Sequence, residues 1–261
     1  GVWGVNLAVI SIFIYALNKF SKIYKFDFFL LIIIFFSLIY FNVIMGYVRQ
    51  AFSLAFLILA VNNLNFKDRN FSLLFFAFAS LIHLSVIIFI PVWIYLFRDK
   101  KIIIFTFILS LIILIFFNSG PFLVQIKVFL LKSYVSKGAL LRMVPLFACI
   151  IIFILNYKKL LTENKYLNIF MFYCILLTVG LIALMLSSQS FSALADRLFV
   201  YLTLFQFIVI GQYFSKVIPK ENKVYLHYVS FVSIFYFTLL FVWFLYGEYS
   251  IFWLNYNFIS S

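Results

Sequence analysis

The sequence has 261 residues, of which 67% are hydrophobic and only 10% are charged. A soluble domain carries about 25% charged residues, so this chain lacks the polar groups to cover a soluble surface, and its hydrophobicity also excludes intrinsic disorder. Its two cysteines, Cys149 and Cys174, lie in apolar stretches and do not make a disulfide scaffold. Basic residues of membrane proteins gather in cytoplasmic loops, so the net charge of +13 indicates topology rather than nucleic-acid binding.

The apolar stretches are long and unbroken, as in residues 28–41. A helical span needs about 20 apolar residues, whereas transmembrane strands alternate polar and apolar residues. We therefore predict an all-α polytopic membrane protein. Its nine hydrophobic segments are expected at residues 2–18, 26–44, 47–64, 71–97, 102–118, 140–156, 166–187, 194–214 and 224–246.

The fourth segment, residues 71–97, is long for one crossing and contains His83 and Pro91. Basic loops follow the first, third, fourth, sixth and eighth segments, and simple alternation divides the 20 Lys and Arg equally between the two sides. If the fourth segment enters and returns, 14 of the 20 lie on one side, as the positive-inside rule requires. We therefore predict that this segment is broken or re-entrant.

Ionisable residues in or beside membrane spans are costly, so each is a candidate for function. Arg49 and Gln50 lie at the outer end of the third segment, and the neighbours Asp196 and Arg197 lie at the outer end of the eighth. Adjacent helical residues do not face each other, so we expect Asp196 and Arg197 to find partners elsewhere. His83 lies deep in the fourth segment. The alternatives are that Arg49 extends to lipid phosphates and that His83 bonds a neighbouring helix.

The outer side carries a small group of cations, most of them in or next to a loop over residues 119–139, which is predicted to contain a helix in the membrane interface. Arginine suits bidentate contacts to phosphate, and lysine acts as a point charge. We therefore predict a lipid-linked phosphate or pyrophosphate as the ligand, with ordinary lipid headgroups as the alternative. The cations are Arg49, Lys127, Lys132, Lys137, Arg142 and Arg197.

Several other chemistries have no motif in this sequence. It lacks a phosphate-binding Gly-x-x-x-x-Gly-Lys-Ser/Thr loop. It also lacks a His-Glu-x-x-His or Cys/His cluster, and its seven acidic residues include no pair suited to share a divalent cation. We therefore expect no metal and no cofactor.

Three short stretches, in this order, resemble the EpsG/Wzy-type polysaccharide polymerases. YVRQAFSLA at residues 47–55 is similar to the family's IRQALA signature, and LIHLSV at residues 81–86, followed by Pro91, is similar to its FHxSA element. ADRL at residues 195–198, with Tyr201, resembles the late R…Y element. The resemblance covers about residues 10–210. The upstream span and the R-x-GTDY loop of the family are missing here, so we expect residues 1–261 to be one integral-membrane domain without that upstream part.

The resemblance implies a membrane glycosyltransferase that polymerises undecaprenyl-pyrophosphate-linked repeat units at the outer face of the bacterial cytoplasmic membrane. Its implied partners are the lipid-linked glycan donor and acceptor, membrane lipids and a chain-length regulator. Fixed arginines can stabilise the charge on the departing pyrophosphate without a metal, and a base must take the acceptor proton. The base candidates are His83, which we favour, and Asp196. The predicted substrate-binding residues are Arg49, Gln50, Lys127, Lys132, Arg142 and Arg197.

Three other functions remain open. A flippase for lipid-linked oligosaccharides also needs a basic cavity, but such transporters are usually built from two similar halves, and no internal repeat is visible. A membrane acyltransferase would need a cytoplasmic donor site, whereas the unexplained charges here gather outside. An O-antigen ligase shares the lipid-pyrophosphate chemistry and differs in the acceptor.

Overall fold

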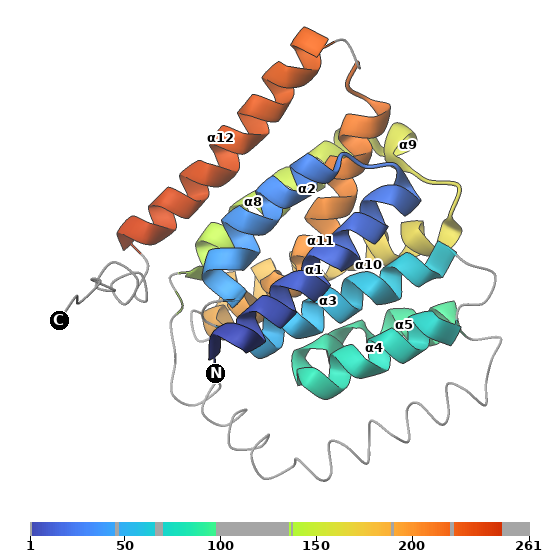
Figure 1. Ribbon diagram of the computed structural model, residues 1–261, viewed down its shortest axis with the longest axis vertical. Coiled ribbons are helices and arrows are strands. Elements are labelled where there is room, and N and C mark those ends of the chain that lie inside the picture. Colours follow the sequence, from blue (N-terminus) through green and yellow to red (C-terminus); the bar gives the residue numbers. More distant parts are fainter. Residues whose placement is uncertain are drawn as a thin grey trace.

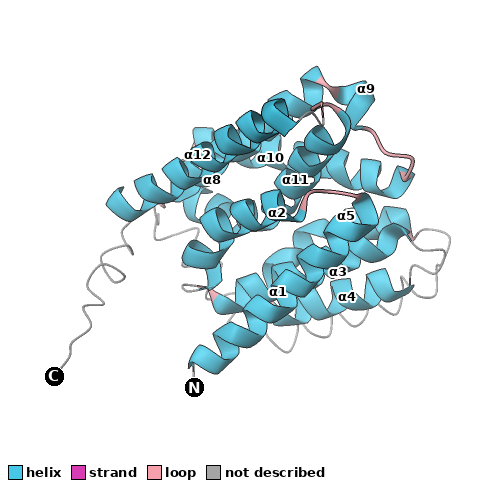
Figure 2. Cartoon of the chain, turned by 45° about the horizontal axis from the view of Figure 1, so that its top comes forward, coloured by secondary structure: helices cyan, strands magenta, loops and turns pink. Residues whose placement is uncertain are grey.

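The computed structural model describes residues 2–44, 47–65, 70–97, 136, 138–188, 191–219 and 222–246. Within these ranges the chain is a bundle of helices and connecting loops, without a strand (Figures 1 and 2). In chain order the helices are α1 (Val2–Tyr24), α2 (Phe28–Ile34), the π-helix η1 (Phe35–Ile44), α3 (Val48–Asn62), the 3₁₀-helix η2 (Asn63–Asn65), α4 (Asn70–Ile82), the 3₁₀-helix η3 (Leu84–Phe89), α5 (Ile90–Leu96), α8 (Gly138–Leu155), α9 (Tyr157–Leu160), α10 (Lys165–Ser187), α11 (Ser192–Lys216) and α12 (Asn222–Tyr246).

The predicted all-α membrane fold is confirmed. Eight of the nine predicted hydrophobic segments fall in the described ranges, and each of the eight is helical. Helices α1, α8, α10, α11 and α12 are long and apolar enough to cross a membrane, and shorter apolar helices lie between them. The segment at 102–118 and the predicted interface helix of the 119–139 loop lie outside the described residues, except for the last positions of that loop.

Helix α11 is the centre of the bundle. In the most apolar stretch of α11, 83% of the residues are buried inside the protein, whereas in that of α12 only 11% are buried. A helix that is apolar on all sides must be surrounded by other helices or by lipid. Helix α11 is therefore enclosed by its neighbours, α8 and α10 foremost. Helix α12 lies on the flank (Figure 1), where the side chains of Phe231, Ile234 and Phe241 are exposed to the surroundings.

Polar side chains join the helices mainly by bonding to backbone carbonyls. The hydroxyl of Ser53 on α3 donates to the carbonyl of Ala79 on α4 at 2.7 Å, and the amide of Asn62 on α3 donates to Ala16 on α1 at 3.1 Å. On the flank, the Tyr236 hydroxyl of α12 donates to the Gln206 side chain of α11 at 2.8 Å. Such bonds hold helices together where lipid provides no hydrophobic drive for their association.

The predicted break in the fourth segment is confirmed. Helix α4 ends at Ile82, His83 is extended (φ −150°, ψ 116°), and η3 and α5 follow. The rings of Phe76 and Trp93 then stack with their centroids 4.3 Å apart. In a continuous helix these two residues would be about 25 Å apart. The chain therefore folds back on itself at His83, and α4 and α5 lie side by side (Figure 1).

The described cations are sorted between the two ends of the bundle. All eight described lysines lie on the end where α1, α9 and α11 finish and α12 begins, which we call the lysine end (Figure 1). All three described arginines lie within the first two turns of α3, α8 and α11, at the opposite end, which we call the arginine end. This separation agrees with one cytoplasmic and one outer face.

We predict from the hairpin at His83 that the loop after α5 lies on the same side of the membrane as the lysine end. A topology reporter fused after Lys101 should read as cytoplasmic, like one fused after Lys159, whereas one fused after Gly138 should read as extracytoplasmic. An extracytoplasmic signal after Lys101 would contradict the re-entrant arrangement.

We also predict that Gly211 on α11 is required for close packing. A Cβ there would come within 2.5 Å of the Phe26 ring, whereas a Cβ at Gly180 on α10 would meet nothing within 4 Å. Overpacking a filled core costs about 1–3 kcal/mol, so Gly211→Ala should lower the melting temperature of the detergent-purified protein. Gly180→Ala is the matched control and should not lower it. Equal melting temperatures for the two variants would contradict this account.

Candidate functional site

Six of the eight predicted site residues lie together at the arginine end. Arg49 and Gln50 begin α3, and His83 forms the break after α4. Arg142, Asp196 and Arg197 lie within the first two turns of α8 and α11. Lys127 and Lys132, predicted to bind substrate, lie outside the described residues. Residues that are up to 148 positions apart in sequence therefore converge because α3, α8 and α11 all begin at this end and α4 finishes there.

Asp196 pairs with Arg142 across the interface of α8 and α11. The Arg142 Nη1 donates to the Asp196 carboxylate and also to the Asp196 backbone carbonyl, the latter at 3.2 Å. Each side chain is only 13% exposed. The carboxylate also lies against Gly138, where a Cβ would be 3.4 Å from its oxygen. The expectation that Asp196 finds its partner outside its own helix is confirmed.

Gln50 and Arg197 link the beginnings of α3 and α11. The Gln50 side chain is 2% exposed, and its amide donates to the backbone carbonyl of Arg197. This bond satisfies a buried amide and fixes α3 against α11, as buried polar groups require. The role of Gln50 in substrate binding stays a prediction, since in this structure its donor holds two helices together.

Arg49 caps the broken end of α4. Its Nη2 donates to the Ile82 carbonyl at 3.2 Å, while the side chain as a whole is exposed. The last carbonyls of a helix have no partner within the helix, so the guanidinium supplies one at the break. A guanidinium carries five N–H donors, and this contact leaves others for an anion. Contact with lipid phosphates is therefore not needed to explain the position of Arg49.

His83 follows Ile82, the residue whose carbonyl Arg49 caps. Its Nδ1 accepts the Ser85 backbone N–H at 3.3 Å, and its ring centroid is 6.0 Å from that of Tyr201 on α11. Arg197 lies one helical turn before Tyr201 on α11. A neutral imidazole that accepts at one nitrogen carries its proton on the other, so His83 presents Nε2–H as a donor in this arrangement.

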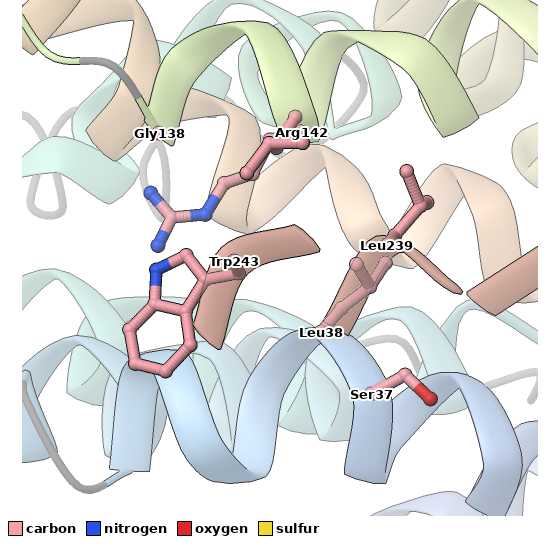
Figure 3. A pocket seen from close by; sticks show the side chains of 7 residues that line it. Ser37, Leu38, Gly138, Arg142, Leu239 and Trp243 are labelled. Carbon is pink, nitrogen blue, oxygen red and sulfur yellow. The ribbon is translucent and has the colours of Figure 1, made fainter. Parts of the chain in front are cut away.

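A small pocket adjoins Arg142 between η1, α8 and α12 (Figure 3). Its lining includes Trp243, which sequence reasoning did not select. A tryptophan near the outer end of the last span is typical of the aromatic belt of membrane proteins, so its sequence position gave no sign of a site. The residues that line the pocket are Ser37, Leu38, Gly138, Leu141, Arg142, Leu239 and Trp243.

Within the described ranges, no three His, Cys, Asp or Glu side chains gather closely enough to hold a metal ion. The site as described is instead made of guanidinium, imidazole, amide and carboxylate groups. These groups can bind an oxyanion, stabilise charge that develops on it, and exchange a proton.

Comparison with known proteins places the chain in a family. No match was found among curated proteins or among solved structures. A family model described as the EpsG family matches residues 4–258, which is nearly the whole chain and includes all of the candidate site residues. This match confirms the resemblance seen in the three short motifs. The chain belongs to the EpsG family.

Proposed function

We propose that this multi-pass membrane protein polymerises surface polysaccharide, joining undecaprenyl-pyrophosphate-linked repeat units at the outer face of the bacterial cytoplasmic membrane. Membership in the EpsG family supports a role in surface-polysaccharide polymerisation. The observation that carries the proposal is the convergence of Arg49, Arg142 and Arg197 at the end opposite the lysines, beside His83 and Asp196.

The reaction is a glycosyl transfer. A hydroxyl oxygen of the acceptor glycan forms a bond to the anomeric carbon of the donor. The bond from that carbon to the pyrophosphate oxygen breaks, and polyprenyl pyrophosphate leaves with the electron pair. The hydroxyl proton passes to a base. The charge that develops on the leaving oxygen is stabilised by preorganised donors, which are most effective where water is scarce, and arginines held by neighbouring helices meet this requirement.

The two candidates for the base, Asp196 and His83, have different hydrogen-bond partners in the structure. Asp196 is held by Arg142, but a carboxylate has two oxygens that accept hydrogen bonds, and an anion that binds Arg142 would loosen its hold on Asp196. His83 accepts the Ser85 N–H at Nδ1 and must give up that bond before the same nitrogen can accept a proton. Both residues remain candidates, and the variants below separate them.

The first test is deletion of the gene in the bacterium that carries it. Loss of a polymerase should leave single repeat units attached to the final carrier, because export and attachment continue without chain growth. Surface polysaccharide would be resolved by length on a gel. Loss of all attached glycan would indicate a ligase instead, and unchanged chain lengths would contradict a role in polymerisation.

The second test concerns the arginines in a complemented deletion strain. Arg49→Ala and Arg197→Ala should each reduce long chains by about 100-fold or more, since removal of one preorganised donor costs about that much. Lys159→Ala, at the lysine end, is the matched control and should leave chain lengths unchanged. Membrane levels of each variant, measured on immunoblots, must equal those of the wild type. Normal chain lengths in Arg49→Ala would contradict a role for Arg49 in the reaction.

The same strain separates the base candidates. If His83 is the base, His83→Ala should abolish long chains while Asp196→Asn, which keeps the shape of the side chain, should retain part of the activity. The reverse order would assign the base to Asp196. Equal, full activity of both variants would contradict a base at either position.

A further inference from the structure

The pocket beside Arg142 has two donor side chains at its edge. Figure 3 shows the guanidinium of Arg142 and the indole nitrogen of Trp243 on the same side of the pocket, directed toward one another. Both groups are donors only, without an acceptor atom, so neither can satisfy the other. The bonds to Asp196 use Nη1 of Arg142, and the guanidinium has two further nitrogens. An acceptor, most favourably a negatively charged oxygen, completes this pair of donors.

The rest of the pocket is mainly apolar. Leu38 of η1, Leu141 of α8 and Leu239 of α12 contribute to its lining (Figure 3). The hydroxyl of Ser37, also in the lining, is fully buried and has no hydrogen-bond partner in the described structure. The ten-residue η1 is a π-helix, a rare form that frequently marks functional sites. The pocket thus combines a cationic edge with an apolar interior.

The position of the pocket fits a ligand that arrives from the membrane. Helix α12 covers it with Leu239 and Trp243, while the opposite side of α12 is exposed, for example at Phe241 and Leu245. An amphiphile in the bilayer can therefore reach the pocket past a helix that already faces lipid. Because Arg142 belongs to both the pocket and the ion pair with Asp196, a phosphate held here lies next to the proposed reaction site.

We propose that this pocket binds the phosphate end of the polyisoprenyl carrier lipid. The phosphate oxygens bind Arg142 and Trp243 at the edge of the pocket. The first isoprene units enter along Leu38, Leu141 and Leu239, which must move apart to admit them because the space there is about 10 Å³. This inference rests on the proposed function, because it gives the carrier of that reaction its place. A bulk phospholipid has the same phosphate chemistry. In the proposed reaction, however, it is the phosphate of the carrier lipid that must reach Arg142, the residue paired with Asp196.

The test is lipid binding to the full-length protein, measured by native mass spectrometry of wild type and three variants. Trp243→Phe keeps a ring and removes the donor, and Leu239→Phe fills the pocket at a half-buried lining residue. Leu245→Phe is the matched control, because it makes the same change at a residue that is 58% exposed. The probes are undecaprenyl phosphate, phosphatidylglycerol and inorganic phosphate.

Wild type and Leu245→Phe should bind one undecaprenyl phosphate in preference to phosphatidylglycerol. Trp243→Phe and Leu239→Phe should weaken that binding by about tenfold or more, as expected for a lost hydrogen bond to a charged group and for a filled pocket. Equal binding by all four proteins would overturn the proposal. Equal competition by phosphatidylglycerol would make the pocket a general lipid site. Equal competition by inorganic phosphate would show that the protein does not recognise the isoprenoid part of the lipid. Either result would also overturn it.

The polysaccharide assay separates this inference from the proposed function. If deletion leaves single repeat units but Trp243→Phe and Leu239→Phe give normal chains and normal lipid binding, the function stands and the pocket assignment fails. If the two variants lose lipid binding but deletion leaves chain lengths unchanged, the pocket is a carrier-lipid site and the polymerase function fails.

Discussion

Backbone polar groups inside a bilayer must find partners within the protein, because lipid offers none. The reversal at His83 is where this constraint is most demanding, since it ends α4 in the middle of the fourth hydrophobic segment. Two carbonyls near the break accept hydrogen bonds from side chains of other helices, and one backbone N–H is bonded by His83 itself. Arg49 bonds Ile82, and the Tyr173 hydroxyl bonds Ile88. The imidazole of His83 itself accepts the Ser85 N–H. The position of Arg49 at the arginine end follows from satisfying this break.

The same groups therefore serve structure and chemistry together. Arg49 caps a helix and faces outward, and Gln50 fixes α3 against α11. Arg142 neutralises a nearly buried carboxylate and also lines a pocket. These contacts position the donors before any substrate binds, and preorganised donors need no rearrangement when charge develops. The central, enclosed helix α11 makes this possible because it carries Asp196, Arg197 and Tyr201 into contact with three different neighbours.

Much of the fold was predictable because each span is a long apolar run, and the break in the fourth segment followed from its length, its polar interior and the charge of its flanking loops. The candidate site was predictable only as a set of residues. That Asp196 pairs with Arg142, and that Gln50 bonds Arg197, depends on the rotation of each helix about its axis. A helix such as α11, apolar on nearly every side, gives no amphipathic stripe to fix that rotation. Trp243 was missed for a related reason, since only the packing of α12 against η1 brings it beside Arg142.

The ion pair between α8 and α11 also bears on how the protein is made. Arg142 and Asp196 are 54 residues apart, and α8 leaves the ribosome first. At a synthesis rate of about 5–20 residues per second, Asp196 is synthesised on the order of several seconds after Arg142. An unpaired charge is energetically costly in the bilayer. We therefore expect α8 to remain near the insertion machinery or the headgroups until α11 is present. Membrane integration of these two helices should then be coupled, and loss of either charge should reduce the insertion of both.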